Sequence, residues 1–378
     1  MEQVNTLLHV FKSFVSSEEI ENILDSHDYQ ENARKWTGED HIFFWLLASS
    51  EQWQNYRESE DKLALEPGLA SVDHTTLSKK ASLIPYEAVK EILELLGSRF
   101  NRKARRSLDL PVSLAALDST TITVGENQLP WAPYHGKRSG VKIHTLFHVD
   151  TLLPIQAEPS KGLTHDASVA GKFAHQLITS VRDRAYATIG DFDGLEEDRK
   201  CFVIRLKKSM YTQKRKSLRR LESEQSRVIE DYTAKIGKGQ KQSKHRFRVV
   251  CFYDDEGNTL RVATNLMSVS AEDIATLYKA RWQVELFHRF LKQHLNMNHF
   301  FGTTPNAVYG QLLCAIMAYM LLQFLYNQLS PKWEFTHPTF VQFARELILG
   351  VLPDEVKGTL AKFLHDRRTL LSFKEFYG

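Results

Sequence analysis

Cysteine is scarce in this chain. Only Cys201, Cys251 and Cys314 occur among 378 residues, and no two of them form a C-x-x-C pair. So small and odd a number excludes a fold held together by disulfides, and the lack of a His/Cys cluster at ligand spacing argues against structural zinc. Both features are typical of a reducing compartment, and we expect a cytoplasmic protein.

Long hydrophobic runs, a signal peptide and a nucleotide-binding loop are also lacking. The longest apolar stretch, Leu312–Tyr326, contains Gln323 and is shorter than the roughly 20 residues that span a membrane. The opening MEQVN has neither the basic nor the apolar region of a signal peptide. GKGQ (237–240) lacks the spacing of a P-loop. We therefore expect a soluble protein with no membrane partner, in which Leu312–Tyr326 is a buried core helix.

Net charge nearly cancels, at 49 Lys+Arg against 46 Asp+Glu, but the charge is unevenly distributed. Residues 200–248 hold 16 basic and four acidic side chains, a local excess of +12 in a chain whose total is +3. Binding of a polyanion requires such a concentration, because neutralised phosphates release condensed counterions. A solvated surface arm is the alternative explanation.

The spacing of apolar residues divides the chain into helical and strand-rich parts. Residues 1–110 have helical spacing. Alternating β-branched and aromatic residues predict strands at 114–124 and 141–150, and a hairpin formed by 246–253 and 259–265. The order of strands and helices predicts an α/β fold with a mixed sheet.

One helical segment resembles a DNA-reading motif. Val72–Pro85 has two lysines and a possible helix start at Thr75 or Thr76, like the second half of a helix-turn-helix. An ordinary turn between packed helices gives the same pattern. The sequence leaves both explanations open.

Isolated carboxylates near strand ends mark a candidate site. Asp118 lies at the end of an apolar strand, and Asp183 directly follows another short strand. A buried, unpaired carboxylate is costly unless it binds a cation. The sequence therefore points to a cation site at this edge of the sheet.

Other residues compete for roles at that site. Asp166 and Asp191 are rival acids for the second position, although Asp166 is more typical of a helix cap and Asp191 of a turn. Lys142 and His144 share one face of the strand next to Asp118, from which they could approach a substrate phosphate.

A long helix predicted from Ser270 to about Leu295 supplies the remaining groups. At about 100° per residue, one polar stripe contains Tyr278, Arg281, Glu285, His288 and Lys292. A surface ladder of ion pairs would look the same. Two aspartates and one glutamate could instead hold two divalent metal ions through oxygen ligands for phosphoryl transfer.

The helix also carries a family signature. YKARWQVELFHRFLK (Tyr278–Lys292) resembles the Y-(2)-R-(3)-E-(6)-K motif of the insertion-sequence-four family of DDE transposases. The resemblance covers about residues 110–326, with the further motifs ALDSTTI, GVKIH, GLTHD, DRAY, FVIRLK and FGTTPNAVYGQL in the family's order.

The resemblance implies a fold, a triad and a set of DNA contacts. The fold is a ribonuclease-H-like mixed sheet with flanking helices, a β-rich insertion before the last catalytic helix and an all-helical N-terminal domain. The implied triad, which would hold two Mg²⁺ (or Mn²⁺) ions, is Asp118, Asp183 and Glu285. The implied DNA-contacting residues are Tyr278, Arg281, Lys292, Arg205 and Lys207. Beside them we expect Arg184, Lys142 and His288 to contact DNA as well.

The resemblance also implies how the domains are used. Residues 1–110 would bind the transposon end, 111–208 and 269–328 would form the catalytic domain, 209–268 would be the basic insertion, and 329–378 would be a helical region for dimerisation. The implied activity is cut-and-paste transposition of a bacterial insertion sequence on double-stranded DNA, with a hairpin intermediate and a homodimeric synaptic complex. A DNA-binding repressor without catalysis and a ribonuclease-H-like nuclease are the alternatives.

Two departures from the family pattern stand out. Ala185 replaces the glycine of the D-R-G-Y motif, which is tolerable if that position does not need a positive φ. The insertion has no tryptophan to hold a flipped base, which leaves Phe252, Tyr253 and Trp282 as candidates.

Overall fold

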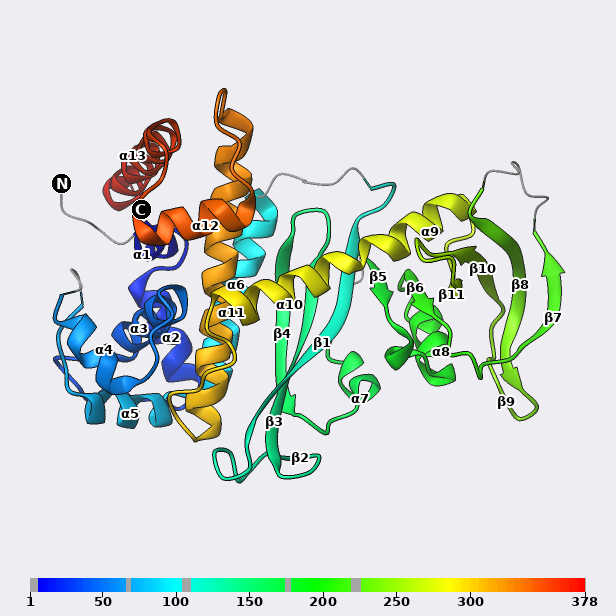
Figure 1. Cartoon of the computed structure of the whole chain (residues 1–378), viewed down its shortest axis with the longest axis horizontal. Helices are drawn as coiled ribbons and strands as arrows, with labels where there is room; N and C mark the ends of the chain where they lie inside the picture. The colour runs from blue at the N-terminus through cyan, green and yellow to red at the C-terminus, as the bar shows by residue number, and fades with distance from the viewer. Residues whose placement is uncertain (1–5, 66–68, 104–109, 174–177, 219–225, 378) are drawn as a thin grey trace.

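The computed structural model describes residues 6–65, 69–103, 110–173, 178–218 and 226–377 of the chain. Figure 1 shows helices at the N-terminal side, a sheet in the middle and a further group of strands at the far end. The chain is a mixed α/β protein, as the sequence predicts.

The N-terminal region is helical wherever it is described. Its helices are α1 (Thr6–Lys12), α2 (Ser17–Ser26), α3 (Gly38–Ser50), α4 (Tyr56–Leu63), α5 (His74–Leu83) and α6 (Tyr86–Lys103). The start predicted for α5 was wrong by a few residues. Asp73 is the cap, and its carboxylate accepts hydrogen bonds from the backbone N–H groups of Thr75 and Thr76.

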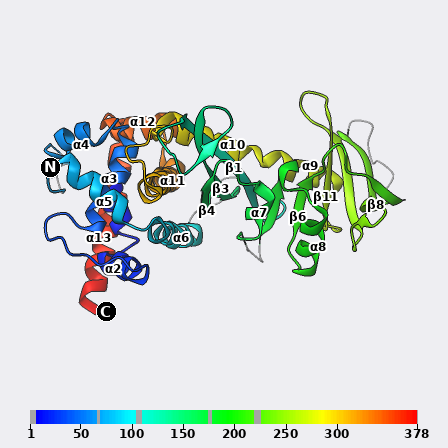
Figure 2. The same cartoon turned by 90° about the horizontal axis from the view of Figure 1, so that it is seen from below.

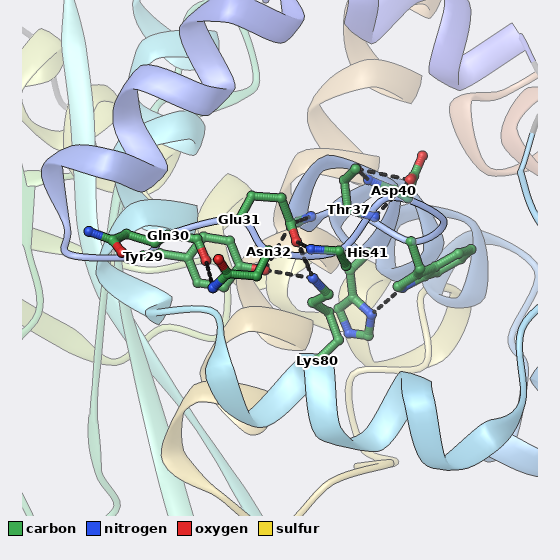
Figure 3. Close-up of polar contacts among 11 residues, drawn as sticks. Tyr29, Gln30, Glu31, Asn32, Thr37, Asp40, His41 and Lys80 are labelled. Atoms are coloured by element: carbon green, nitrogen blue, oxygen red, sulfur yellow. Dashed lines mark hydrogen bonds and ion pairs between the residues drawn. The ribbon is translucent and has the colours of Figure 1, made fainter.

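A buried polar cluster fixes α5 in place (Figure 3). The Lys80 ammonium donates to the Tyr29 hydroxyl and to Glu31 Oε1, both at 2.8 Å. Glu31 Oε2 also accepts from the backbone N–H of Gly38 at 2.6 Å, so one carboxylate ties the 31–38 loop to the helix. Of the two lysines that suggested a helix-turn-helix, only Lys79 is exposed.

The first part of the sheet has antiparallel and parallel pairs. Its strands are β1 (Leu114–Gly125), β2 (Pro133–Tyr134), β3 (Arg138–His148), β4 (Leu153–Lys161), β5 (Thr179–Arg182) and β6 (Phe202–Arg205). β3 pairs antiparallel with β1 and β4, whereas β5 is parallel to both β1 and β6. Helices α7 (Asp166–Ala170) and α8 (Ile189–Glu197) lie between β4 and β6 in the chain. The strands predicted from alternation are present as β1 and β3.

The basic segment extends this sheet. Its strands are β7 (Thr212–Ser217), β8 (Val228–Lys238), β9 (Lys241–Gln242), β10 (Phe247–Tyr253) and β11 (Thr259–Thr264). β10 and β11 form the predicted hairpin, and β11 pairs antiparallel with β6. The order β2-β3-β1-β5-β6-β11-β10-β8-β7 therefore runs through one continuous sheet, with β4 on β3 and β9 on β8.

Two helices replace the single long helix predicted from Ser270. Ser270 is the N-cap, as predicted, and its hydroxyl accepts from the backbone N–H of Asp273. However, α9 (Ala271–Ala280) ends at Arg281, and α10 (Trp282–His294) begins directly after it. Figure 1 shows the two, in yellow, following one another across the sheet.

Helix α11 (Pro305–Leu329) is the core helix predicted from the long apolar stretch. The span Pro305–Lys332 is long and apolar enough to cross a membrane, but its apolar 18-residue window is entirely buried inside the protein. α11 packs against α3, α5 and α6 and against β4 (Figure 2). The N-terminal helices and the sheet therefore share one core, and the C-terminal helices α12 (Phe340–Leu349) and α13 (Asp354–Tyr377) follow it.

Candidate active site

The fold brings the three predicted acids together. Asp118 lies within β1, at the point where its fully buried residues end, so the prediction that it ends the strand was wrong. Asp183 follows β5, which runs parallel to β1 and pairs Arg182 with Leu117. Glu285 is in the first turn of α10, which packs on β1.

Arg281 joins two of these acids. Its Nη2 donates to Glu285 Oε1 at 2.6 Å, and its Nη1 lies 3.7 Å from Asp118 Oδ2. The Arg281 side chain is only 12% exposed, so water screens these contacts weakly. One guanidinium therefore faces both carboxylates and offsets part of their negative charge.

Asp183 has partners of its own. The Tyr278 hydroxyl donates to Asp183 Oδ1 at 3.2 Å, and Arg205 Nη1 lies 3.7 Å from the same oxygen. Tyr278 is largely buried at the end of α9, whereas Arg205 is the last residue of β6. Asp183 is thus held between a helix and a strand of the sheet.

The electrostatics of Asp118 reflect this crowding. The pKa of Asp118 is raised to about 6. Burial is the largest cause, the charges of Glu285 and Asp183 act in the same direction, and Arg281 opposes the shift. The three carboxylates therefore sense one another across the site. Such mutual repulsion favours a bound cation.

The three carboxylates are suitable ligands for a divalent metal ion, but in this structure their oxygens are not arranged around a common point. Within the described ranges, no group of three or more His, Cys, Asp or Glu residues has the geometry of a metal site. The Arg281 guanidinium lies between Asp118 and Glu285, where it is a stand-in for a cation. Carboxylate oxygens are the ligands that Mg²⁺ and Mn²⁺ prefer.

Replacing Asp118 by Asn should stabilise the metal-free protein at high pH. The folded-state pKa of Asp118 is raised, so the stability due to this group is present at low pH and is lost as pH rises through about 6. We expect Asp118→Asn to raise the free energy of unfolding by on the order of 1–3 kcal/mol at pH 8, and by almost nothing below pH 4. Urea denaturation in EDTA measures both values.

The control for this prediction is Asp255→Asn. Asp255 is exposed, and hydrogen bonds from Lys279 and Arg227 lower its pKa, so its replacement should bring no gain at pH 8. A loss of stability for Asp118→Asn at pH 8 would show that its charge is not a burden in the folded state.

The rival acids have other partners. Asp166 Oδ1 accepts hydrogen bonds from Ser119 Oγ at 2.9 Å and from Lys142 Nζ at 3.0 Å. It lies in the first turn of α7, and its side chain does not cap that helix. Asp191 bonds to the cap residue Thr188 at the start of α8, so its assignment to a turn was wrong. Lys142 is therefore engaged by Asp166 beside the site.

Two histidines near the site are buried. His144 is fully buried, its Nε2 is 3.0 Å from Ser160 Oγ, and burial lowers its pKa to about 4. His288 is 5% exposed, its Nε2 is 3.5 Å from Thr145 Oγ1, and burial lowers its pKa to about 3. The structure therefore does not present His288 to DNA.

Among the other predicted DNA contacts, Tyr278 and Arg281 are also largely buried, whereas several of the rest are more accessible. Arg184 is exposed directly after Asp183. Lys292 reaches β1, where its Nζ donates to the Thr121 carbonyl at 3.2 Å. Lys207 is half-buried and lies beyond the end of β6, whose last residue is Arg205.

Sequence reasoning missed Arg261 on β11. Its Nη2 donates to the carbonyls of Lys207 at 3.1 Å and Met210 at 3.0 Å, and so fixes the turn that carries Lys207 and Lys208. The only signal was its place in a strand of a basic hairpin. Ala185, by contrast, is tolerated in place of the family's glycine, because it is not among the residues with positive φ.

Three acids from a sheet and a helix, beside the arginine at the end of β6, form the kind of site that carries out phosphoryl transfer. Comparisons with known proteins identify the family. The family model for the transposase DDE domain matches residues 111–321. The chain belongs to the DDE transposase family, and its function is that of a DNA transposase. Enzymes of this family are polynucleotidyl transferases that use divalent metal ions.

Individual relatives agree. The "Probable transposase for insertion sequence element IS5377" of Geobacillus stearothermophilus is 41% identical over 378 residues, covering 100% of this chain and 98% of that protein. A protein of Sinorhizobium fredii assigned as transposase y4zB is 29% identical over 262 residues, covering 68% of this chain and 73% of that protein. Among solved structures, a piggyBac transposase synaptic complex with hairpin DNA aligns with a TM-score of 0.48 and 12% identity, covering 96% of this chain and 84% of that one.

Proposed function

We propose that this transposase binds the terminal inverted repeats of a bacterial insertion sequence, cuts the DNA there and joins the ends to a target. Asp118, Asp183 and Glu285 would be its catalytic and metal-binding triad. The observation that carries the proposal is the convergence of these acids from β1, from the end of β5 and from α10: Asp118 and Glu285 share the guanidinium of Arg281, and Asp118 senses the charge of Asp183.

We further propose a ribonuclease-H-like fold for residues 111–208 and 269–328. Three antiparallel strands, β4-β3-β1, continue into the parallel strands β5 and β6, with one acid on β1 and one directly after β5. The basic segment 209–268 then separates β6 from the helix that carries Glu285. Residues 1–110, which are helical in the part that the structure describes, would bind the transposon end, and 329–378 would serve dimerisation in a synaptic homodimer.

The triad would hold two Mg²⁺ (or Mn²⁺) ions. When bound, such ions activate the attacking hydroxyl or water and stabilise the leaving oxygen. The chain's own part is to keep three carboxylates on rigid elements and to shield them from bulk water. Asp118 is the most firmly held of the three, because four buried residues of β1 precede it.

Positive side chains around the triad would position the DNA. Arg205 faces Asp183, Arg184 follows it in the chain, and Tyr278 and Arg281 contact the acids directly. Lys292, which reaches β1, and Lys207, beyond the end of β6, would add further positive charge. Lys142 would act through Asp166, whereas His288 would only support α10. Exposed lysines and arginines of the basic segment would hold the flanking backbone.

A flipped base next to the cut would stack on an exposed aromatic ring. Phe252 is buried, which removes one of the three candidates. Tyr253 and Trp282 are each 48% exposed, and Trp282 follows Arg281 directly. We favour Trp282 because it is three residues from Glu285. A cut-and-paste route through a hairpin, in the bacterial cytoplasm, would use such a base.

Incubation of the protein with linear DNA that carries its own element ends, with Mg²⁺ or Mn²⁺, tests this function. Cleavage at the ends, followed by joining to a target, is the expected result. Binding of ends without cleavage would instead indicate a repressor, and cleavage without preference for the ends would indicate a general nuclease.

A further inference from the structure

Arg281 differs from the arginine of an ordinary surface ion pair, because it is buried and contacts two acids of the site. Its partner Glu285, four residues on, is in the first turn of α10, but its second partner, Asp118, belongs to β1. It lies at the break between α9 and α10, and its side chain is 88% buried, as its 12% exposure shows. It therefore links two of the three proposed metal-binding acids across two elements.

The pairing leaves Arg281 incompletely satisfied. Its Nε is buried and has no hydrogen-bond partner among the described residues. A guanidinium offers five donors in a planar fork that matches a phosphate as well as a carboxylate. A buried arginine with an unused donor can thus gain a further bond when a phosphate arrives.

We propose that Arg281 is a latch, which keeps divalent metal ions out of the centre until a phosphate of the DNA end draws its guanidinium away. This inference rests on the proposed function. Glu285 Oε1, which accepts the Arg281 bond at 2.6 Å, is also an oxygen that a metal ion would need. A metal ion and the guanidinium would compete for the same carboxylate charge, so metal binding at this oxygen disfavours the ion pair.

Asp183 has a parallel arrangement. Its Oδ1 is held by Tyr278 and faced by Arg205, both of which are suited to phosphate. A DNA end that engages these groups and Arg281 frees all three acids at once. Because coupling between two ligands is reciprocal, DNA tightens metal binding and metal tightens DNA binding by the same factor.

The test measures Mn²⁺ binding by titration calorimetry, with and without a duplex that represents the cut end and terminates in a 3′-dideoxynucleotide, which cannot react. In the unmodified protein, DNA should tighten Mn²⁺ binding about tenfold or more. In Arg281→Gln, Mn²⁺ should bind tightly without DNA, and the gain on adding DNA should fall to about twofold or less. This collapse separates a latch from a simple loss of charge, which would shift both affinities equally.

Matched variants keep the test decisive. Arg289→Gln changes an exposed arginine on the same helix and should leave the tenfold gain intact. Arg281→Lys, which keeps the charge but not the fork, should show a smaller shift in the same direction and replaces Arg281→Gln if that variant is unstable. An unchanged gain in both Arg281 variants would overturn the latch. Failure of Asp118→Asn to weaken Mn²⁺ binding would instead count against the proposed triad.

Discussion

Glu285→Gln should bind element ends as the unmodified protein does, and cleave them roughly 10³-fold more slowly or worse. Glutamine keeps the shape of the side chain but cannot supply an anionic ligand, so a metal ion loses one of its three carboxylates. A 10³-fold loss corresponds to about 4 kcal/mol of transition-state stabilisation. Single-turnover cleavage of a labelled end duplex, with affinity measured separately, gives both quantities.

A neighbouring glutamate provides the control. Glu272 is exposed on α9 and accepts a hydrogen bond from Ser226, far along the helix from the triad. Glu272→Gln should change the rate by less than about threefold, as surface substitutions generally do little. If Glu285→Gln also cleaved within threefold of the unmodified rate, Glu285 would not belong to the triad.

Asp231→Ala should destabilise the protein by about 3–5 kcal/mol. Arg248 and Asp231 form a two-pronged ion pair at 2.7 and 2.8 Å, with side chains only 2% and 3% exposed. Arg248 Nη1 also donates to the carbonyls of Leu266 and Val269, the segment just before α9. Removing the aspartate leaves a buried charge with no anionic partner. Chemical denaturation measures the loss.

The control for this prediction is an ion pair that is exposed instead of buried. Asp255 pairs with Arg227 and Lys279, but it is 58% exposed, so Asp255→Ala should cost less than about 1 kcal/mol. The double variant Asp231→Leu/Arg248→Met should recover much of the stability lost by Asp231→Ala, because apolar groups of similar size need no partner. Equal losses for Asp231→Ala and Asp255→Ala would contradict the account of the buried pair.

Local patterns in the sequence predicted much of this fold. Strands β1 and β3 were predicted by alternation, the β10–β11 hairpin by its turn, and the start of α9 by its Ser270 cap, because these signals lie within a few residues of one another. The break at Arg281 was not predicted, since the helical spacing continues through it. At this break the Arg281 side chain meets Asp118 of β1, a contact that no local spacing signals.

Contacts between residues far apart in the chain could not be predicted from the sequence. Gly310 in α11 lies against Trp45 of α3, whose ring comes within 2.6 Å of where a Cβ would be, so only glycine fits there. Nothing near either residue in the sequence signals that contact. The acids of the site could be predicted by motif, whereas their pairing with Arg281 and the burial of His288 depend on how α10 docks on the sheet.

The central claim is that Asp118 binds the metal ion directly, and Asp118→Cys tests it most directly. A thiolate binds Mg²⁺ poorly and accepts softer ions better, so Mg²⁺ and Mn²⁺ should separate in this variant. The account predicts that Asp118→Cys cleaves element ends with Mn²⁺ and not with Mg²⁺, while the unmodified protein cleaves with both. Equal cleavage by Asp118→Cys with either ion would contradict it.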